Sequence, residues 1–215
     1  MNMRSKILAA AAASALALSF GTAASAIVYT LGTGNAAISG FAGPYGTVTV
    51  TLANATTANV SFASATPQFW FLGAQAADVN VNATTWTLSN LLGNGGALSN
   101  GGSNNVDGFG VFNQTIDQFD GFGSKSSTIS FTLTNVGSTW ASDSLVLTPN
   151  ASGNTVGAHI GVCTNTPCTE FTATGFATNG SAPIPEPATW GMMLVGFFGM
   201  GSILRMQRRR ALATA

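Results

Sequence analysis

Few residues of this chain could carry chemistry, and the clearest pair is Cys163 and Cys168. They enclose four residues in the stretch Cys-Thr-Asn-Thr-Pro-Cys, whose asparagine and proline suit a tight turn. In an oxidising compartment this spacing favours a small disulfide loop. A structural zinc site would need four nitrogen or sulfur ligands, and a redox pair more often has the spacing Cys-x-x-Cys.

A repeated Asp-Gly-Phe-Gly motif supplies acidic candidates. It begins at Asp107 and again at Asp120, thirteen residues later, with Asp117 between them. One hypothesis is a calcium site made by these three aspartates with Asn104 or Asn105, because calcium prefers hard oxygen ligands. The other is a pair of turns in which glycine supplies positive φ. The spacing is not that of an EF-hand, so we favour the turns, and we expect no other cofactor.

His159 and the acidic residues give little support for catalysis. His159 is the one histidine of the chain, and no nucleophile signature lies near it. We therefore interpret it as a hydrogen-bonded structural residue. A glycosidase needs only two suitably separated carboxylates, so the six acids between residues 27 and 183 do not single out any pair. The chain is not expected to be an enzyme.

Aromatic side chains could bind sugars by stacking. The candidates are Phe69-Trp-Phe71, Trp86 and Trp140. Successive side chains of a strand alternate between its faces, so one aromatic of the triplet should point away from the other two. Aromatic residues also bury large areas, and a charge-poor domain needs them in its core. We favour the core for most of them.

The elements that must position these residues are strands. Hydrophobic residues alternate with threonine or serine in Thr47–Leu52, Val60–Phe62, Trp86–Leu88 and Ser127–Thr134. About nine or ten such strands, separated by Gly, Asn and Ser clusters, predict an all-β domain over residues 27–182: an antiparallel β-sandwich, jelly-roll-like in arrangement. The Gly- and Asn-rich stretch from Leu91 to Asn105 is expected to be a loop.

The amino-acid composition limits which classes of binding partner are expected. Only 7% of the residues are charged, against roughly 25% in typical soluble domains. Between residues 27 and 183 there are one base, Lys125, and six acids, a formal charge of 1 − 6 = −5. Nucleic acid is therefore not an expected partner, because phosphate binding needs clustered lysine and arginine.

The N-terminus has the three parts of a secretory signal peptide. Arg4 and Lys6 form a basic start, residues 7–20 are apolar, and small residues lead to Ala-Ser-Ala at residues 24–26. This pattern predicts a signal peptide over residues 1–26, cut between Ala26 and Ile27 by signal peptidase after entry into the secretion machinery. The alternatives are an alanine-rich structural helix and an uncleaved anchor.

The sequence of the C-terminal region predicts a short membrane-spanning helix. Residues 188–204 carry no charge, and as a helix they would be about 25 Å long. Pro187 precedes the run where a helix can begin, and Trp190 is typical of a membrane interface. The basic cluster of residues 205–210 predicts a cytoplasmic C-terminus and argues against a buried helix of a soluble domain; its arginines are Arg205, Arg208, Arg209 and Arg210.

Taken together, Pro185-Glu186-Pro187, Trp190, the glycine-rich apolar span and the arginine cluster resemble the PEP-CTERM sorting signal in its Pro-Glu-Pro-x-x-Trp form. The resemblance covers residues 183–210 and leaves 211–215 as a short tail. Gly191 stands where alanine is common, and Met206-Gln207 interrupts the basic cluster.

This resemblance implies a Gram-negative bacterium and an exosortase that recognises Pro185, Glu186 and Pro187. Processing at or near the motif would release or transfer the ectodomain. The anchor in the inner membrane would then be transient, and the final location would be the cell surface or the extracellular space.

Three stretches of the middle also resemble a recurrent ectodomain of such tailed proteins: 106–113, 119–122 and 129–135. That resemblance implies no enzymatic activity, and by analogy it suggests a role in exopolysaccharide or biofilm formation. We expect a non-catalytic surface or matrix protein, with exopolysaccharide as a further partner. The alternative hypotheses are a secreted carbohydrate- or calcium-binding module and, least favoured, an extracellular hydrolase.

Overall fold

A computed structural model of the chain describes residues 25–119, 122–180 and 184–185. Nearly all of the predicted signal peptide and sorting tail lies outside these residues, as do Asp120 and Glu186. Thirteen strands, two of them only two residues long, make up the described part, together with the short 3₁₀ helices η1 (Phe122–Ser124) and η2 (Asp143–Leu145).

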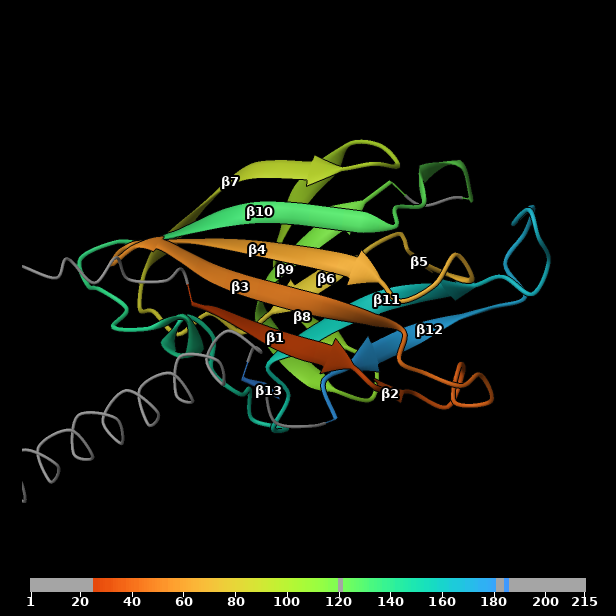
Figure 1. Cartoon of the computed structure of the whole chain (residues 1–215), viewed down its shortest axis with the longest axis horizontal. Helices are drawn as coiled ribbons and strands as arrows, with labels where there is room; N and C mark the ends of the chain where they lie inside the picture. The colour runs from red at the N-terminus through yellow and green to blue at the C-terminus, as the bar shows by residue number, and fades with distance from the viewer. Residues whose placement is uncertain (1–24, 120–121, 181–183, 186–215) are drawn as a thin grey trace, which may run out of the picture.

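The strands form two antiparallel sheets (Figure 1). The first sheet, in spatial order, contains β13 (Ile184–Pro185), β1 (Ala26–Leu31), β3 (Gly46–Asn54), β4 (Thr57–Ser64), β10 (Thr128–Asn135) and β7 (Trp86–Gly93). The second contains β2 (Thr33–Gly34), β12 (Ala173–Thr178), β11 (Val156–Val162), β6 (Ala77–Val79), β9 (Gly110–Gln118) and β8 (Leu98–Val106), while β5 (Phe69–Phe71) pairs with β11 beside β6.

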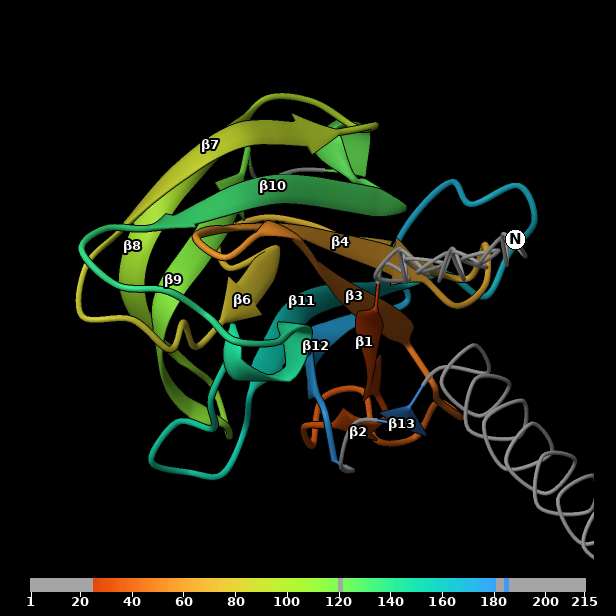
Figure 2. The ribbon, with the colours of Figure 1, turned by 60° about the vertical axis from the view of Figure 1, so that its left-hand side comes forward.

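The two sheets lie face to face, as Figure 2 shows most clearly. The chain passes repeatedly between them: β6 lies in the second sheet, β7 in the first, β8 and β9 in the second, and β10 in the first again. The prediction of an all-β, sandwich-like domain of antiparallel strands is therefore confirmed. The sheets are open, with β7 and β8 at neighbouring edges.

The alternation in the sequence decides which side chains enter the space between the sheets. In β3, Val48 and Val50 are fully buried, whereas the alternating threonines Thr47, Thr49 and Thr51 are only partly so. The same pattern places every second residue of β4 and β10 in the core. These residues are Ala58, Val60, Phe62, Ile129, Phe131 and Leu133. Period-two patterning therefore predicts both the element type and the buried face here.

The prediction of a loop from Leu91 to Asn105 is wrong. Leu91–Gly93 completes β7, and most of the remainder forms β8, paired with β9. β8 is an edge strand with largely exposed side chains, so its glycines and asparagines need not pack against a core. Two irregularities in its register with β9 lie between Asn100 and Asn104 and accommodate these residues.

Phenylalanine side chains occupy the centre of the core. Phe62 lies edge-to-face against Phe71, with ring centroids 6.0 Å apart. It also stacks with Phe131, with ring centroids 6.2 Å apart. Because β4 and β10 belong to the first sheet and Phe71 extends the second, this trio joins the two sheets. The sandwich therefore depends on these rings more than on any surface interaction.

We predict that Phe62→Ala lowers the free energy of unfolding of the full-length chain by about 3 to 5 kcal/mol, because a fully buried ring is lost and a cavity remains. Urea denaturation followed by tryptophan fluorescence measures this change. Leu92→Ala is the control, since Leu92 is 66% exposed and its truncation should change stability by less than about 0.5 kcal/mol. Equal effects of the two variants would contradict this description of the core.

Candidate functional site

The predicted disulfide is present at one end of the molecule. Cys163 and Cys168 are bonded, with their Cα atoms 5.6 Å apart, immediately after β11. Asn165 Nδ2, within the ring, donates to Thr169 Oγ1, just after Cys168, at 2.6 Å. Thr164 and Thr172 bridge the two arms of the loop, their hydroxyl oxygens 2.7 Å apart. The bond therefore closes an exposed loop that is also held by side-chain hydrogen bonds.

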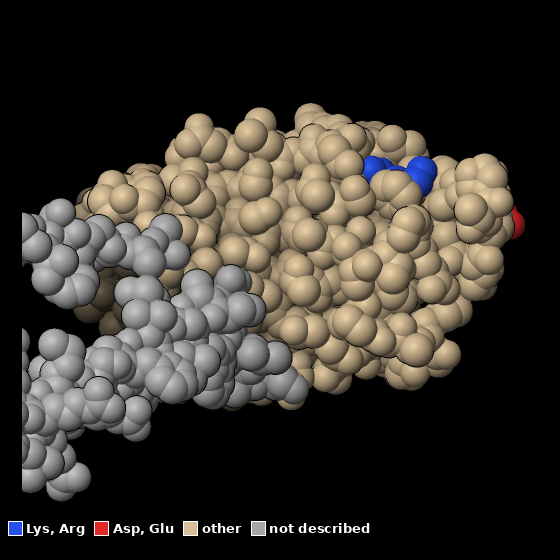
Figure 3. All heavy atoms as spheres, in the orientation of Figure 1, with Lys and Arg blue, Asp and Glu red and all other residues tan. Residues whose placement is uncertain are grey.

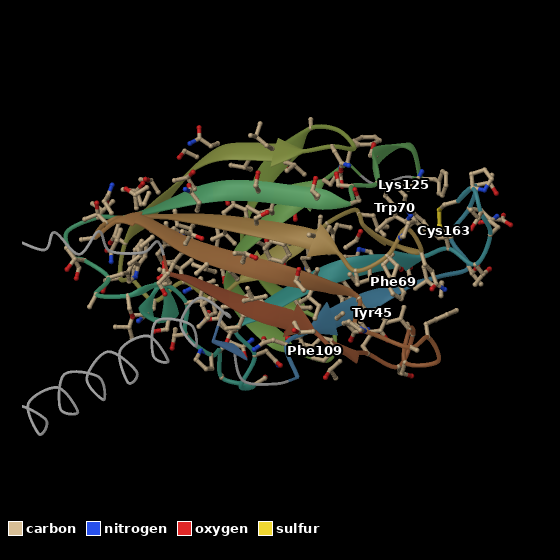
Figure 4. All side chains as sticks on the ribbon, in the orientation of Figure 1. Tyr45, Phe69, Trp70, Phe109, Lys125 and Cys163 are labelled. Carbon is tan, nitrogen blue, oxygen red and sulfur yellow. A yellow bond between two sulfur atoms is a disulfide. The ribbon has the colours of Figure 1, made fainter. Side chains whose placement is uncertain are left out.

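An aromatic cluster around a lysine lies beside this loop (Figure 4). The ammonium group of Lys125 is 3.4 Å from the ring centroid of Phe122 and 5.2 Å from that of Trp70. Phe171 packs edge-on against Phe122 at 5.0 Å. Lysine over aromatic faces is a cation–π arrangement. The indole of Trp70 thus already has a cation over its ring, and its Nε1 donates to the Pro67 carbonyl at 3.0 Å.

The other aromatic candidates serve the core. Phe69 and Phe71 are buried, as the alternation along β5 requires, and Trp70 is the partly exposed member of the triplet. Trp140 is only 3% exposed, and its Nε1 donates to the Asn82 carbonyl at 2.7 Å. Trp86 is partly buried and donates to Gln114 Oε1 at 3.0 Å. Each of these three tryptophans therefore donates its indole N–H to a group within the protein.

Asp107 and Asp117, two of the acidic residues proposed from the sequence as calcium ligands, lie apart, and the third, Asp120, lies outside the described residues. Asp107 lies in the turn between β8 and β9, and Asp117 lies near the far end of β9. Asp107 is exposed and accepts a hydrogen bond from Asn35 Nδ2 at 3.2 Å. Gly108 and Gly110 adopt φ of 83° and 85°, as the alternative turn hypothesis requires. In the described parts of the chain, no group of three or more His, Cys, Asp or Glu residues is placed to hold a metal.

A different pair of acids lies close together, and sequence reasoning missed it. Asp78 in β6 is fully buried, and neither carboxylate oxygen has a hydrogen-bond partner. Burial, and secondarily the nearby Asp117 carboxylate, raise the pKa of Asp78 well above its ordinary value. The available signal was an aspartate between the apolar residues Ala77 and Val79, an environment in which a charged residue needs a partner.

His159 has the structural surroundings expected from the sequence. It lies in the central strand β11, where its ring stacks on Phe176 with centroids 4.5 Å apart. Its Nδ1 is 3.3 Å from the Ala74 carbonyl. These contacts bind β11 to β12 and to the segment that precedes β6. They support the interpretation of His159 as a packed, hydrogen-bonded residue.

A half-open cavity of about 540 Å³ lies between the β6–β7 connection and the segment after β10. Its lining contains no charged residue; the polar side chains come from Asn82, Thr84, Asn135, Ser138 and Thr139. Asn135 is only 5% exposed, and its Oδ1 has no hydrogen-bond partner. The cavity thus offers neutral amide and hydroxyl groups, and one of its lining residues carries a buried acceptor without a donor.

The first residue of the predicted sorting motif pairs with the first residue predicted after signal cleavage. In the register of β13 with β1, Pro185 lies opposite Ile27 and Ile184 opposite Val28. Both views place β13 beside β1 at the edge of the first sheet (Figures 1 and 2). Glu186, Pro187, Trp190 and the arginine cluster lie outside the described residues.

The helix expected over residues 188–204 also lies outside them. Within residues 25–119, 122–180 and 184–185, the structure contains no helix with the length and hydropathy of a bilayer span. Comparison with known proteins adds no assignment: no model of a protein family, no curated protein and no solved structure matches this chain.

We predict that replacing both cysteines by alanine lowers the free energy of unfolding by about 2 kcal/mol, because the short cross-link restricts the unfolded chain. Thermal denaturation with and without reductant measures the effect. The wild type should lose stability on reduction, and the double variant should not respond to reductant. A response to reductant that persists in the variant would contradict the assignment.

Proposed function

We propose that this protein is an exported, non-catalytic component of the cell surface or extracellular matrix, sorted through its C-terminal tail by an exosortase. The signal peptide and the tail are features of the sequence, and the described domain lies between them. The observation that carries the proposal is the pairing of Ile27 with Pro185. The last described strand thus ends at Pro185, the first residue of the predicted motif.

This arrangement suits a domain that is sorted by processing of its C-terminal tail. The folded part begins at β1, just at the predicted cleavage site, and ends at the same sheet edge. After removal of the tail the released part would keep both sheets, because their core lies wholly within residues 29–177.

The surface is consistent with a matrix role. The face seen in Figure 3 is almost entirely uncharged, and Lys125 is the one lysine or arginine in the described residues. Hydroxyl and amide groups dominate the exposed side of the first sheet, on alternate residues of β4 and β10. Such a surface offers hydrogen bonds to neutral, hydroxyl-rich material and little attraction for polyanions such as nucleic acid.

We predict that Glu186→Ala in the producing bacterium leaves the protein in the inner membrane at its unprocessed mass, whereas the wild type is found at the surface or in the medium at a lower mass. Cell fractionation with mass spectrometry measures both. Glu170→Ala is the matched control, because Glu170 is an exposed acid of the folded domain and its loss should change neither location nor size. Deletion of the exosortase should reproduce the Glu186 phenotype.

The sorting proposal fails if the wild-type protein has the same size and location with and without the exosortase. It also fails if Glu186→Ala is processed normally. Loss of the protein from all fractions of the Glu186 variant would point to degradation, and a pulse–chase measurement would then show whether the unprocessed form appears first.

A second candidate function, binding of neutral carbohydrate, is favoured by the cavity lined by Asn135. The lining groups are amides and hydroxyls, and the unpartnered Asn135 Oδ1 needs a donor. The partly exposed Trp70 is the competing candidate, since stacking on its ring would also retain a sugar.

If the cavity binds carbohydrate, Asn135→Ala should reduce retention on the producer's polysaccharide by about tenfold, the loss expected for one good hydrogen bond. Trp70→Ala should leave retention unchanged. Affinity electrophoresis in polysaccharide gels compares the two. Loss in Trp70→Ala alone would assign binding to the aromatic cluster, and unchanged mobility of all forms would exclude carbohydrate binding at either place.

A further inference from the structure

Asp78 is the most unusual side chain of the described structure. Its neighbours Ala77 and Val79 point into the core between the sheets, so Asp78 points to the opposite, outer side of the second sheet. There it is 0% exposed, with both oxygens unpartnered. A carboxylate removed from water without hydrogen bonds is strongly destabilising unless its charge is neutralised.

Two further oxygen-bearing side chains lie beside it. Thr115 is directly opposite Asp78 in the register of β6 with β9, is 0% exposed, and its Oγ1 also lacks a partner. Asp117 follows two residues later on the same strand and interacts electrostatically with Asp78. Its Oδ1 accepts the backbone N–H of Gln75 at 2.8 Å.

A glycine leaves room for these oxygens to converge. A Cβ atom placed on Gly101 of β8 would lie 2.7 Å from both carboxylate oxygens of Asp117 and closer still to Thr115 Oγ1. On the other side of Asp78, its partner in β11 is Gly157, which also lacks a side chain. Oxygen atoms thus gather beside Gly101 on the outer side of the sheet, whereas the ring of Phe112 lies 3.3 Å from where a Cβ of Gly157 would stand.

No basic side chain is available in the described residues to neutralise this cluster by an ion pair. Lys125 is the one lysine or arginine there, and its ammonium group lies over Phe122 and Trp70 and donates to the Phe122 carbonyl at 3.2 Å. The cluster consists of two acids and a hydroxyl. It offers hard oxygen ligands, a set that suits calcium or magnesium and not a soft metal.

We propose that Asp78, Asp117 and Thr115 bind one hard divalent cation, calcium in the first instance, on the outer side of the second sheet. Asp78 supplies the fully buried carboxylate, Thr115 a hydroxyl oxygen, and the partly exposed Asp117 the side open to solvent. Water completes the coordination. Calcium is favoured over magnesium because its coordination tolerates irregular oxygen sets, whereas magnesium requires a near-octahedral one.

This site differs from the one first considered from the sequence. It keeps Asp117 but replaces Asp107 and Asp120 by Asp78 and Thr115, which come together only through the pairing of β6 with β9. It is also independent of the sorting proposal, because a cation would bind the folded domain whether or not an exosortase processes the tail.

The test uses the full-length chain in mild detergent, stripped with chelator, and titrated with calcium chloride or magnesium chloride in a calorimeter. We expect one calcium ion per chain and a melting temperature higher by about 5 to 10 °C at a hundredfold excess over Kd. Asp78→Asn and Asp117→Asn should each weaken calcium binding at least tenfold, and Thr115→Val should weaken it less. Asp107→Asn should bind like the wild type.

Several outcomes would overturn the proposal. No heat and no thermal shift with either ion would show that a proton alone neutralises Asp78. Binding that survives in both Asp78→Asn and Asp117→Asn, or that is lost in Asp107→Asn, would place the ion elsewhere. If Asp78→Asn does not fold, the partly exposed Asp117 and the near-isosteric Thr115→Val variant still decide the question, since cooperative melting shows that each is folded.

Discussion

The structure depends on one constraint: two sheets must share a single apolar core, in a chain with too few charges to gain much from surface ion pairs. Phe62, Phe71 and Phe131 meet that constraint by joining β4 and β10 of the first sheet to the extension of the second. Burial of apolar area is the dominant favourable term in folding. Because strands of both sheets contribute buried residues to this core, the two layers are expected to form together and not as separate hairpins.

Local alternation explains why part of this fold could be predicted from the sequence. The alternating hydrophobic residues predict both a strand and the face that it buries. Examples are Val48, Val50, Ile129 and Phe131. β8 could not be found in that way, since Asn100, Gly101 and Gly102 have low strand propensity and become a strand only through pairing with β9. The same limit applies to the oxygen cluster, because residues 78 and 115 are neighbours only in the register of two strands. The hydrophobic pattern of a strand predicts which of its faces is buried. The side chains that meet on neighbouring strands depend on strand pairing, which that pattern does not give.

The two sides of the second sheet differ in a way that follows from its place in the sandwich. Its inner side belongs to the common core, but its outer side has only a small cluster of its own, made by Val106, Phe109 and Phe112 with Phe176 packed against it. Glycines 157 and 161 lie on that outer side, and rings approach them: Phe112 at Gly157, Phe171 at Gly161. Polar groups buried there, such as Asp78, are thus enclosed by a thin covering of aromatic side chains and glycine backbone, not by a third layer.

The edge of the first sheet sets how the domain is connected to the rest of the chain. β1 has β3 on one side and the two-residue β13 on the other, so the last described residues occupy an edge that would otherwise present unpaired backbone groups. Pro185 suits that position, because proline lacks an N–H and is tolerated in edge strands. A two-residue pairing adds little stability, and it is readily lost if a partner draws the strand away. Ile184 and Pro185 are therefore held beside Ile27 and Val28 by a pairing that is weak enough to be exchanged for another partner.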